Sequence, residues 1–393
     1  MDIMIRALHL RGHLIDVVRT NQSWYIQEDS PHYKAITIPV VRAFDHHFID
    51  PILKKIIAIE RGESPVMSFV SLQYQAVCDK FFGSGITYGE LLRGADLWLM
   101  RVDFVFEFPR PTMPNIIHVG GFQCKPSKTL PEHLEEFVQS SGEHGVIIMS
   151  LGTFVNELPD DVANGIAATF AKLPQKVIWS YKGRRPSTLG NNTLVVKWMP
   201  QNDLLGHPKV KLFVAHGGTN GVQEAIYHGV PVVGIPLFYD QYDNLLRLEE
   251  RGAAKTLTVA TVDKDDNFLE AIQAVLNEPS YRMNMQRLSR LHRDKPMMPM
   301  DSALFWIEFV MRHKGAAHLK AQAYRMPWYS YYSIDVALFA LAIFTLTILG
   351  TALCFRRQQG AAVITRIPHD CTFHRESGKR DIIPPSRDSE LEH

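Results

Sequence analysis

A glycine-rich stretch, His216-Gly217-Gly218-Thr219-Asn220-Gly221, directly follows the apolar run Lys211–Ala215. Glycine lets a backbone approach a ligand closely. Where such a turn opens a helix, the free N–H groups of the first turn and the helix dipole attract an anion. His216 and Asn220 can add side-chain donors. The stretch therefore predicts a phosphate-binding turn, and a tight turn that carries a structural histidine is the alternative.

Residues beside this turn match the other parts of a nucleotide sugar. Trp198 ends the preceding predicted strand and can offer a flat face to a base. Glu224 lies about one helical turn after Asn220, where a carboxylate can accept hydrogen bonds from two ribose hydroxyls. Asp240 and Gln241 follow the next strand, and a carboxylate with an amide can bind sugar hydroxyls. The order predicts a base platform, a diphosphate cradle, a ribose acceptor and a hexose clamp along one sheet edge.

The elements that must position these residues alternate between strand and helix from Val146 to His292. Strands are predicted over 146–151, 176–180, 193–197, 211–215 and 231–235, and helices over 159–171, 201–205, 220–227, 241–251, 267–276 and 281–292. This alternation implies a parallel sheet with right-handed crossovers. In such sheets ligands bind outside the carboxyl ends of the strands.

The part before residue 146 is less regular, and the region 40–80 shows no strand–helix alternation. Helices are predicted over 2–11, 41–61, 88–92 and 131–139, and strands over 14–18, 96–106 and 116–119. The polar stretch 126–145 is typical of a linker between domains. We therefore expect an acceptor-side domain over 1–122 and a nucleotide-binding domain over 123–315.

The C-terminal region carries an uncharged apolar run, Val336–Phe355, which is about as long as a bilayer core requires. Aromatic residues Trp328, Tyr329, Tyr331 and Tyr332 precede the run, and Arg356-Arg357 closes it. This pattern predicts a juxtamembrane segment over 316–333, a transmembrane helix over 334–355 and a disordered tail over 356–393. A buried core helix is the alternative.

Composition narrows the function classes. The chain has 393 residues and a formal net charge of +1, so nothing favours nucleic acid as a partner. Its four cysteines, Cys78, Cys124, Cys354 and Cys371, lack the spacing of metal ligands. We therefore expect no bound metal.

Four stretches together carry a resemblance to a known family. They are Trp198–Pro208, His216–Gly221, Glu224–Pro231 and Pro236–Asn244, and they closely resemble the signature of animal UDP-glucuronosyltransferases. Ser150-Leu151-Gly152-Thr153 is similar to the loop that opens the donor domain in that family. The resemblance implies an α/β protein of the GT-B class. Two Rossmann-like domains, the N-terminal one incomplete, would precede one C-terminal transmembrane helix.

The resemblance also assigns roles to residues. Trp198 would stack on uracil, Gln201 would contact the uridine and Glu224 would hold the ribose. His216, Gly218, Asn220 and Gly221 would face the diphosphate with Thr153 nearby, and Asp240 and Gln241 would hold the donor sugar. The reaction would move a sugar, from UDP-glucuronic acid by family analogy, to a small lipophilic acceptor with inversion and without a metal. The body would lie in the lumen of the endoplasmic reticulum, and association with itself or with relatives is left open.

The resemblance leaves the catalytic base unassigned. In the family it is a histidine in a loop just before the first helix, oriented by an aspartate, and the sequence begins within that helix. His13 is interpreted as structural, and His46-His47 as part of a solvated helix face. Two hypotheses therefore stay open: a transferase, and a non-catalytic UDP-sugar-binding membrane protein from a truncated isoform or an incomplete gene model. A dinucleotide-dependent dehydrogenase is disfavoured because no Gly-x-Gly-x-x-Gly follows an early strand.

Overall fold

The computed structural model describes residues 1–364 except 22, 24–25, 39–84, 87, 154 and 156. It divides into two compact units, residues Met1–Ala321 and residues Gln322–His393. The predicted helix over 41–61, the His46-His47 pair and the tail beyond 364 lie outside the described residues. The predicted domain boundary at 122/123 stays a prediction.

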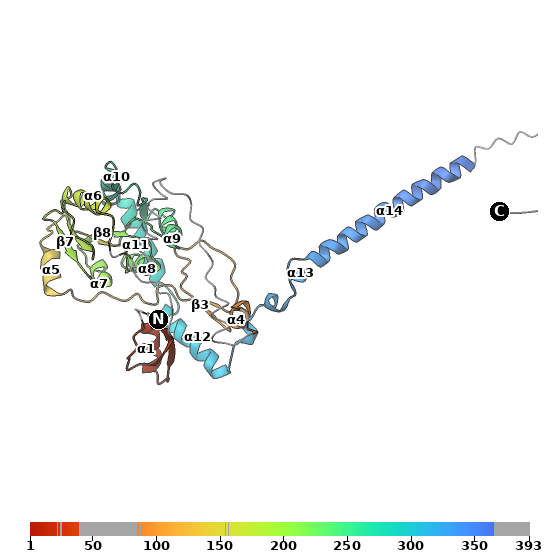
Figure 1. Cartoon of the computed structure of the whole chain (residues 1–393), viewed down its shortest axis with the longest axis horizontal. Coiled ribbons are helices and arrows are strands. Elements are labelled where there is room, and N and C mark those ends of the chain that lie inside the picture. Colours follow the sequence, from red (N-terminus) through yellow and green to blue (C-terminus); the bar gives the residue numbers. More distant parts are fainter. Residues whose placement is uncertain are drawn as a thin grey trace, which may run out of the picture. The chain divides into compact units, whose positions relative to one another are not determined.

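A six-stranded sheet forms the centre of the first unit (Figure 1). Its strands are β5 (Val146–Ser150), β6 (Lys176–Ser180), β7 (Thr193–Val196), β8 (Val210–Ala215), β9 (Val232–Gly234) and β10 (Ala254–Thr256). All neighbouring strands pair in parallel. The predicted α/β class with a parallel sheet is confirmed.

The strand order is β10-β9-β8-β5-β6-β7. The first three strands of this sheet along the chain therefore extend to one side, and the last three extend to the other. The direction of winding reverses between β5 and β8, which is the point where ligands bind in doubly wound folds. The loops that follow β5 and β8 contain Gly152-Thr153 and the glycine-rich turn.

Helices cover both faces of the sheet, as Figure 1 shows. Alternate residues of β5 belong to two separate buried clusters: Ile147 and Met149 to one, and Val146 and Ile148 to the other. The first cluster includes α6 (Asp160–Ala171) and α10 (Asn267–Asn277). The second includes α5 (Glu132–Gln139), α7 (Gln201–Leu205), α8 (Thr219–His228), α9 (Gln241–Glu249) and α11 (Pro279–Arg293). The two-residue period of strands thus places α8 against one face of the sheet.

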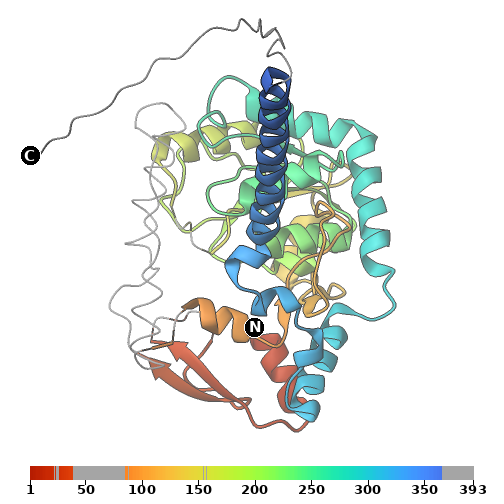
Figure 2. The same ribbon diagram turned by 90° about the vertical axis from the view of Figure 1, so that its right-hand side faces the viewer.

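Two small parallel ribbons come from the first part of the chain. β1 (Asp16–Thr20) pairs with β2 (Lys34–Ile38), and Figure 2 shows them side by side. β3 (Trp98–Met100) pairs with β4 (Ile116–His118). β1 lies two residues later than predicted, and the strand predicted over 96–106 is reduced to β3. Beyond Met100 the chain turns, because the carbonyl of Asp103 accepts hydrogen bonds from the N–H groups of Phe106 (3.2 Å) and Glu107 (3.0 Å).

Three helices accompany these ribbons: α1 (Asp2–Leu10), α4 (Tyr88–Gly94) and α12 (Pro299–His313). The first two match their predictions, whereas α12 was not predicted. Ala303 and Leu304 of α12 are buried with Met4 of α1 and Ile117 of β4. The chain therefore returns from the six-stranded sheet and the helices that cover it, called the sheet domain below, to pack against its own first helix.

A short 3-10 turn, η1 (Ala317–Leu319), lies near the end of the first unit. The second unit contains a second 3-10 turn, η2 (Gln322–Arg325), the one-turn helix α13 (Trp328–Tyr331) and the long helix α14 (Ile334–Ile364). Within α14, Ile334–Gln358 is long and apolar enough to cross a membrane and is not buried by other parts of the protein. The helix continues through Arg356 to Ile364, where disorder was predicted. Arg, Gln and Ala favour helix, and no proline occurs between Pro327 and Pro368 to stop it.

Candidate functional site

The predicted site residues follow strands that end at one edge of the sheet. Ser150 of β5 lies opposite Ala215 of β8, and Ala215 lies opposite Gly234 of β9. The loops after these strands contain Thr153, His216 and Asp240. Trp198 follows β7, whose end is in register with the end of β6. The parallel arrangement therefore brings residues that lie far apart in sequence to a common edge.

The glycine-rich turn leads directly into the N-terminus of α8. Gly217 has a left-handed φ of 86°, and its carbonyl accepts a hydrogen bond of 3.0 Å from the side chain of Asn244. Gly218 precedes the first helical residue, and no described side chain caps the helix. The N–H groups of the first turn remain available, and they favour a negatively charged ligand.

Asp240 and Gln241 lie at the start of α9, beside the N-terminus of α8, and they have different environments. Asp240 is exposed, and its Oδ2 accepts hydrogen bonds from Thr219 Oγ1 (2.7 Å) and Asn244 Nδ2 (2.9 Å). Gln241 is buried, and its Oε1 accepts from the N–H groups of Leu237 (2.8 Å) and Phe238 (3.0 Å). Asp240 is therefore open to a ligand, whereas the Gln241 carbonyl oxygen shapes the loop after β9.

Gln201 and Glu224 form a pair between α7 and α8. Gln201 Nε2 donates a 2.7 Å hydrogen bond to Glu224 Oε2. Burial raises the pKa of Glu224, and the hydrogen bond from Gln201 opposes this effect. Trp198 is 74% exposed, so the face of its indole is accessible. Trp198 also precedes Gln201 by only three residues in the sequence.

His216 lies between the glycine-rich turn and the loop after β5. A Cβ atom on Gly152 would come within 2.8 Å of His216 Nε2, so that loop packs directly on the imidazole. Burial lowers the pKa of His216 to about 4, although a backbone hydrogen bond at Ser150 and the charge of Asp240 oppose the shift. Its buried Nδ1 has no hydrogen-bond partner among the described residues. The imidazole is therefore neutral at pH 7 and can take part in one more hydrogen bond.

Arg101 lies at the same candidate site, although no local sequence pattern identifies it. It follows β3, and its guanidinium donates a hydrogen bond to Asn220 Oδ1 in the first turn of α8. Burial lowers the pKa of Arg101, and the charge of Asp240 opposes the shift. Its Nε is buried without a partner among the described residues. The site therefore has a partly desolvated cation as well as the helix N-terminus.

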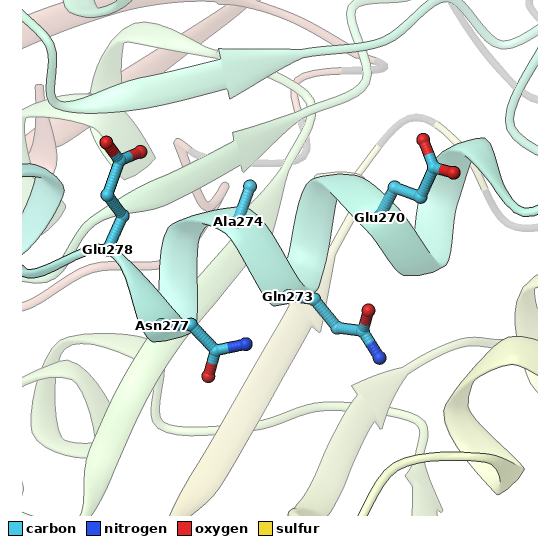
Figure 3. Close-up of a pocket in the computed structure, with 5 residues that line it drawn as sticks. All are labelled: Glu270, Gln273, Ala274, Asn277 and Glu278. Carbon is cyan, nitrogen blue, oxygen red and sulfur yellow. The ribbon is translucent and has the colours of Figure 1, made fainter.

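The hollow in Figure 3 lies elsewhere and contains none of the predicted site residues. It is lined by residues on and just after α10: Glu270, Gln273, Ala274, Asn277 and Glu278. Within the described part of the chain, no group of three or more His, Cys, Asp or Glu residues could hold a metal ion. The expectation of a metal-free site stays a prediction.

Comparisons with known proteins place this chain in a family. The family model described as "UDP-glucoronosyl and UDP-glucosyl transferase" matches residues 48–365. The chain is 52% identical over 282 residues to UDP-glucuronosyltransferase 2A1 of Mus musculus, a match that covers 72% of this chain and 53% of that protein. It is 50% identical over 281 residues to UDP-glucuronosyltransferase 2B15 of Homo sapiens, covering 70% and 53%. The chain belongs to this transferase family and spans about half the length of these curated relatives.

The chain also has some similarity to solved structures of glycosyltransferases. Spinosyn forosaminyltransferase SpnP has a TM-score of 0.49 at 19% identity, with 71% of each chain covered. Glycosyltransferase VinC, solved in complex with DTDP, has a TM-score of 0.45 at 20% identity, with 64% of this chain and 61% of that chain covered.

Proposed function

We propose that this chain binds a UDP-sugar and belongs to an enzyme that transfers the sugar, with inversion, to a small lipophilic acceptor. One observation carries the proposal. The uncapped N-terminus of α8 lies at the switch point of the sheet, with the Gln201–Glu224 pair on the same helix and Asp240 at its first turn. The three parts match the diphosphate, the nucleoside and the sugar of one ligand.

The proposed roles follow the position of each side chain. Trp198 stacks on the uracil, Gln201 contacts the uridine, and Glu224 accepts hydrogen bonds from the ribose. The diphosphate lies at the start of α8, against His216, Gly218, Asn220 and Gly221, with Thr153 on the neighbouring loop. Asp240 and the amide NH₂ of Gln241 bind hydroxyls of the sugar, while the carbonyl oxygen of Gln241 supports the loop beside them. Arg101 adds the positive charge that two phosphates require.

The names of the relatives favour UDP-glucuronic acid as the donor. The family resemblance favours a reaction without a metal. The apolar helix α14 favours a single-pass membrane protein, and the family resemblance favours the endoplasmic reticulum with the body in the lumen. Association with itself or with relatives would be seen as a mass greater than that of one chain in detergent. No feature of the site calls for nucleic acid.

The experiment that tests this proposal measures UDP binding to the purified chain by calorimetry. We expect Trp198→Ala to weaken UDP binding about tenfold, because stacking on one base contributes about 1–3 kcal/mol. The melting temperature should not change, because Trp198 is exposed. Trp328→Ala serves as the control, because Trp328 is also exposed but lies in the second unit, away from the proposed site in sequence. Equal UDP affinity for the Trp198 variant and the unaltered chain would contradict the assigned base platform.

A second measurement separates transfer from binding alone. The chain is incubated with UDP-glucuronic acid and a phenol, and glucuronide formation is followed by mass spectrometry. Product formation supports the transferase. UDP binding without product supports the alternative of a non-catalytic UDP-sugar-binding protein.

A further inference from the structure

The segment that carries Arg101 is attached to the sheet domain by a buried polar network. The ribbon of β3 and β4 continues beyond its strands, because Val119 N donates to Met100 O (2.8 Å) and Gly120 N donates to Val102 O (3.1 Å). The backbone around Arg101 therefore runs beside Val119–Gly121. Both stretches then contact side chains of α8 and α11, which belong to the sheet domain.

The first contact between this segment and the sheet domain is made by Gln223 of α8. Its side chain is fully buried, and its Nε2 donates a 3.0 Å hydrogen bond to the carbonyl of Arg101. Its Oε1 accepts from the N–H of Gly121 (3.0 Å) and from Gln123 Nε2 (3.0 Å). One amide of α8 therefore fixes the backbone of Arg101 and the neighbouring stretch at the same time.

The second contact is made by Asp103, which lies two residues after Arg101 and bonds to His292 and Lys295. It is 6% exposed, and its Oδ2 accepts hydrogen bonds from His292 Nδ1 (2.5 Å) and from Lys295 Nζ (2.7 Å). Its Oδ1 accepts from the N–H of Val105 (3.0 Å). Burial alone would raise the pKa of Asp103, but these hydrogen bonds and the charge of Lys295 hold it at about 2. Both carboxylate oxygens are therefore used as acceptors at neutral pH.

The backbone of Arg101 is thus anchored at its own carbonyl and again two residues later at Asp103. Ordering a residue costs backbone entropy as well as side-chain entropy, so a backbone that is already fixed makes an aimed guanidinium less costly. Its guanidinium is directed at Asn220, in the first turn of α8. The network uses residues outside the predicted donor site to set the geometry of a cation within it.

We propose that Asp103 is a positioning residue: through His292 and Lys295 it fixes the backbone of residues 101–103, so that Arg101 faces the diphosphate of the donor. This inference rests on the proposed function, because it assumes that a nucleoside diphosphate occupies the start of α8. Asp103 itself does not touch the ligand. Its effect is therefore confined to ligands that carry phosphates.

The test uses the full chain with Asp103→Asn and compares UDP with uridine. Asparagine cannot replace the carboxylate, because either orientation of its amide directs an NH₂ group at another donor: His292 and Lys295 on one side, or the N–H of Val105 on the other. We expect UDP to bind about tenfold more weakly, as expected when a charge-assisted contact is lost, and uridine to bind unchanged. Glu308→Gln is the matched control, because Glu308 is also an ion-paired carboxylate, held by Arg11 and His13 of another part of the unit.

A double-mutant cycle shows whether Asp103 acts through Arg101. Arg101→Ala should weaken UDP binding, and adding Asp103→Asn should then have little further effect. Additive losses, unchanged UDP affinity in Asp103→Asn, or equal losses for UDP and uridine would overturn the inference. Lys295→Met, which removes one donor to Asp103, gives the same readouts if Asp103→Asn does not fold. An unaltered chain that binds neither UDP nor uridine would contradict the proposed function itself, and the inference with it.

Discussion

Burial changes the protonation of two residues of the candidate site in opposite senses. It lowers the pKa of His216 to about 4, which keeps the imidazole neutral, and it raises the pKa of Glu224. A neutral imidazole offers one donor and one acceptor, whereas a carboxylate offers only acceptors. His216 can therefore bind a ligand through directed hydrogen bonds without adding another full charge beside Arg101.

The raised pKa of Glu224 predicts a conflict between stability and binding. Glu224 favours folding below its ordinary pKa of 4.5, and this contribution is lost as the pH rises through the higher folded pKa. Glu224→Gln should therefore raise the melting temperature at neutral pH, since glutamine can still accept the hydrogen bond from Gln201. UDP binding should weaken about tenfold, because ribose hydroxyls donate better to a carboxylate. Calorimetry and thermal unfolding measure the two effects.

Both effects have a clear pH dependence. UDP affinity of the unaltered chain should fall as the pH is lowered through the Glu224 pKa, and that of the glutamine variant should fall less. A variant that is less stable than the unaltered chain at neutral pH would contradict the assigned effect of burial.

Some residues of the candidate site can be identified from a local sequence pattern, and others cannot. His216 and Asn220 belong to a local pattern of glycines after a strand, so the pattern itself identifies them. Arg101 lies 119 residues before its partner Asn220, and no local spacing connects them. The pattern of glycines does not identify Thr219, because the hydrogen bond from Thr219 to Asp240 also depends on two strands lying side by side.

At the scale of elements, the strand and helix periods predict the sheet domain well. β5 to β9 and α6 to α11 match their predicted positions to within a few residues. β10 is only three residues long, and it is placed by pairing with β9 rather than by its own pattern. The missed α12 has apolar residues on opposite sides, with Phe305 and Phe309 on one and Leu304 and Ile307 on the other, so it shows no clear single face. Its position depends on packing against α1 and β4.

The turn into α8 should tolerate no side chain at Gly217. Its φ of 86° is left-handed, and a Cβ atom there would lie 2.6 Å from Leu245 Cγ and 2.8 Å from the carbonyl of Gln241. We expect Gly217→Ala to lower the free energy of unfolding by about 3 kcal/mol or more, from backbone strain and overpacking together. Urea unfolding measures the change.

Gly142→Ala is the control for backbone strain alone. Gly142 also has a left-handed φ, of 57°, but a Cβ atom added there would meet nothing within 4 Å. Its substitution should cost about 1 kcal/mol. Equal losses for both variants would show that close contact with α9 does not hold the turn in place.

At the scale of the whole molecule, the chain combines a sheet domain and a separate apolar helix. The sequence predicts both, because each has a strong repeating or compositional pattern. It does not predict how the early ribbons attach to the sheet domain. That attachment depends on buried polar contacts such as Gln223 with Arg101 and Asp103 with His292, which join residues 122 and 189 positions apart.

The division into two units predicts that UDP binding and membrane attachment are separable. A chain that ends at Ala321 lacks α14 and should leave the membrane fraction after alkaline carbonate extraction. Its UDP affinity should stay within about twofold of that of the full chain, because the proposed site lies wholly in the first unit. A chain that ends at Ile364 keeps α14, should stay in the membrane fraction, and controls for loss of the tail alone. Loss of UDP binding only in the shorter chain would show that the second unit supports the site.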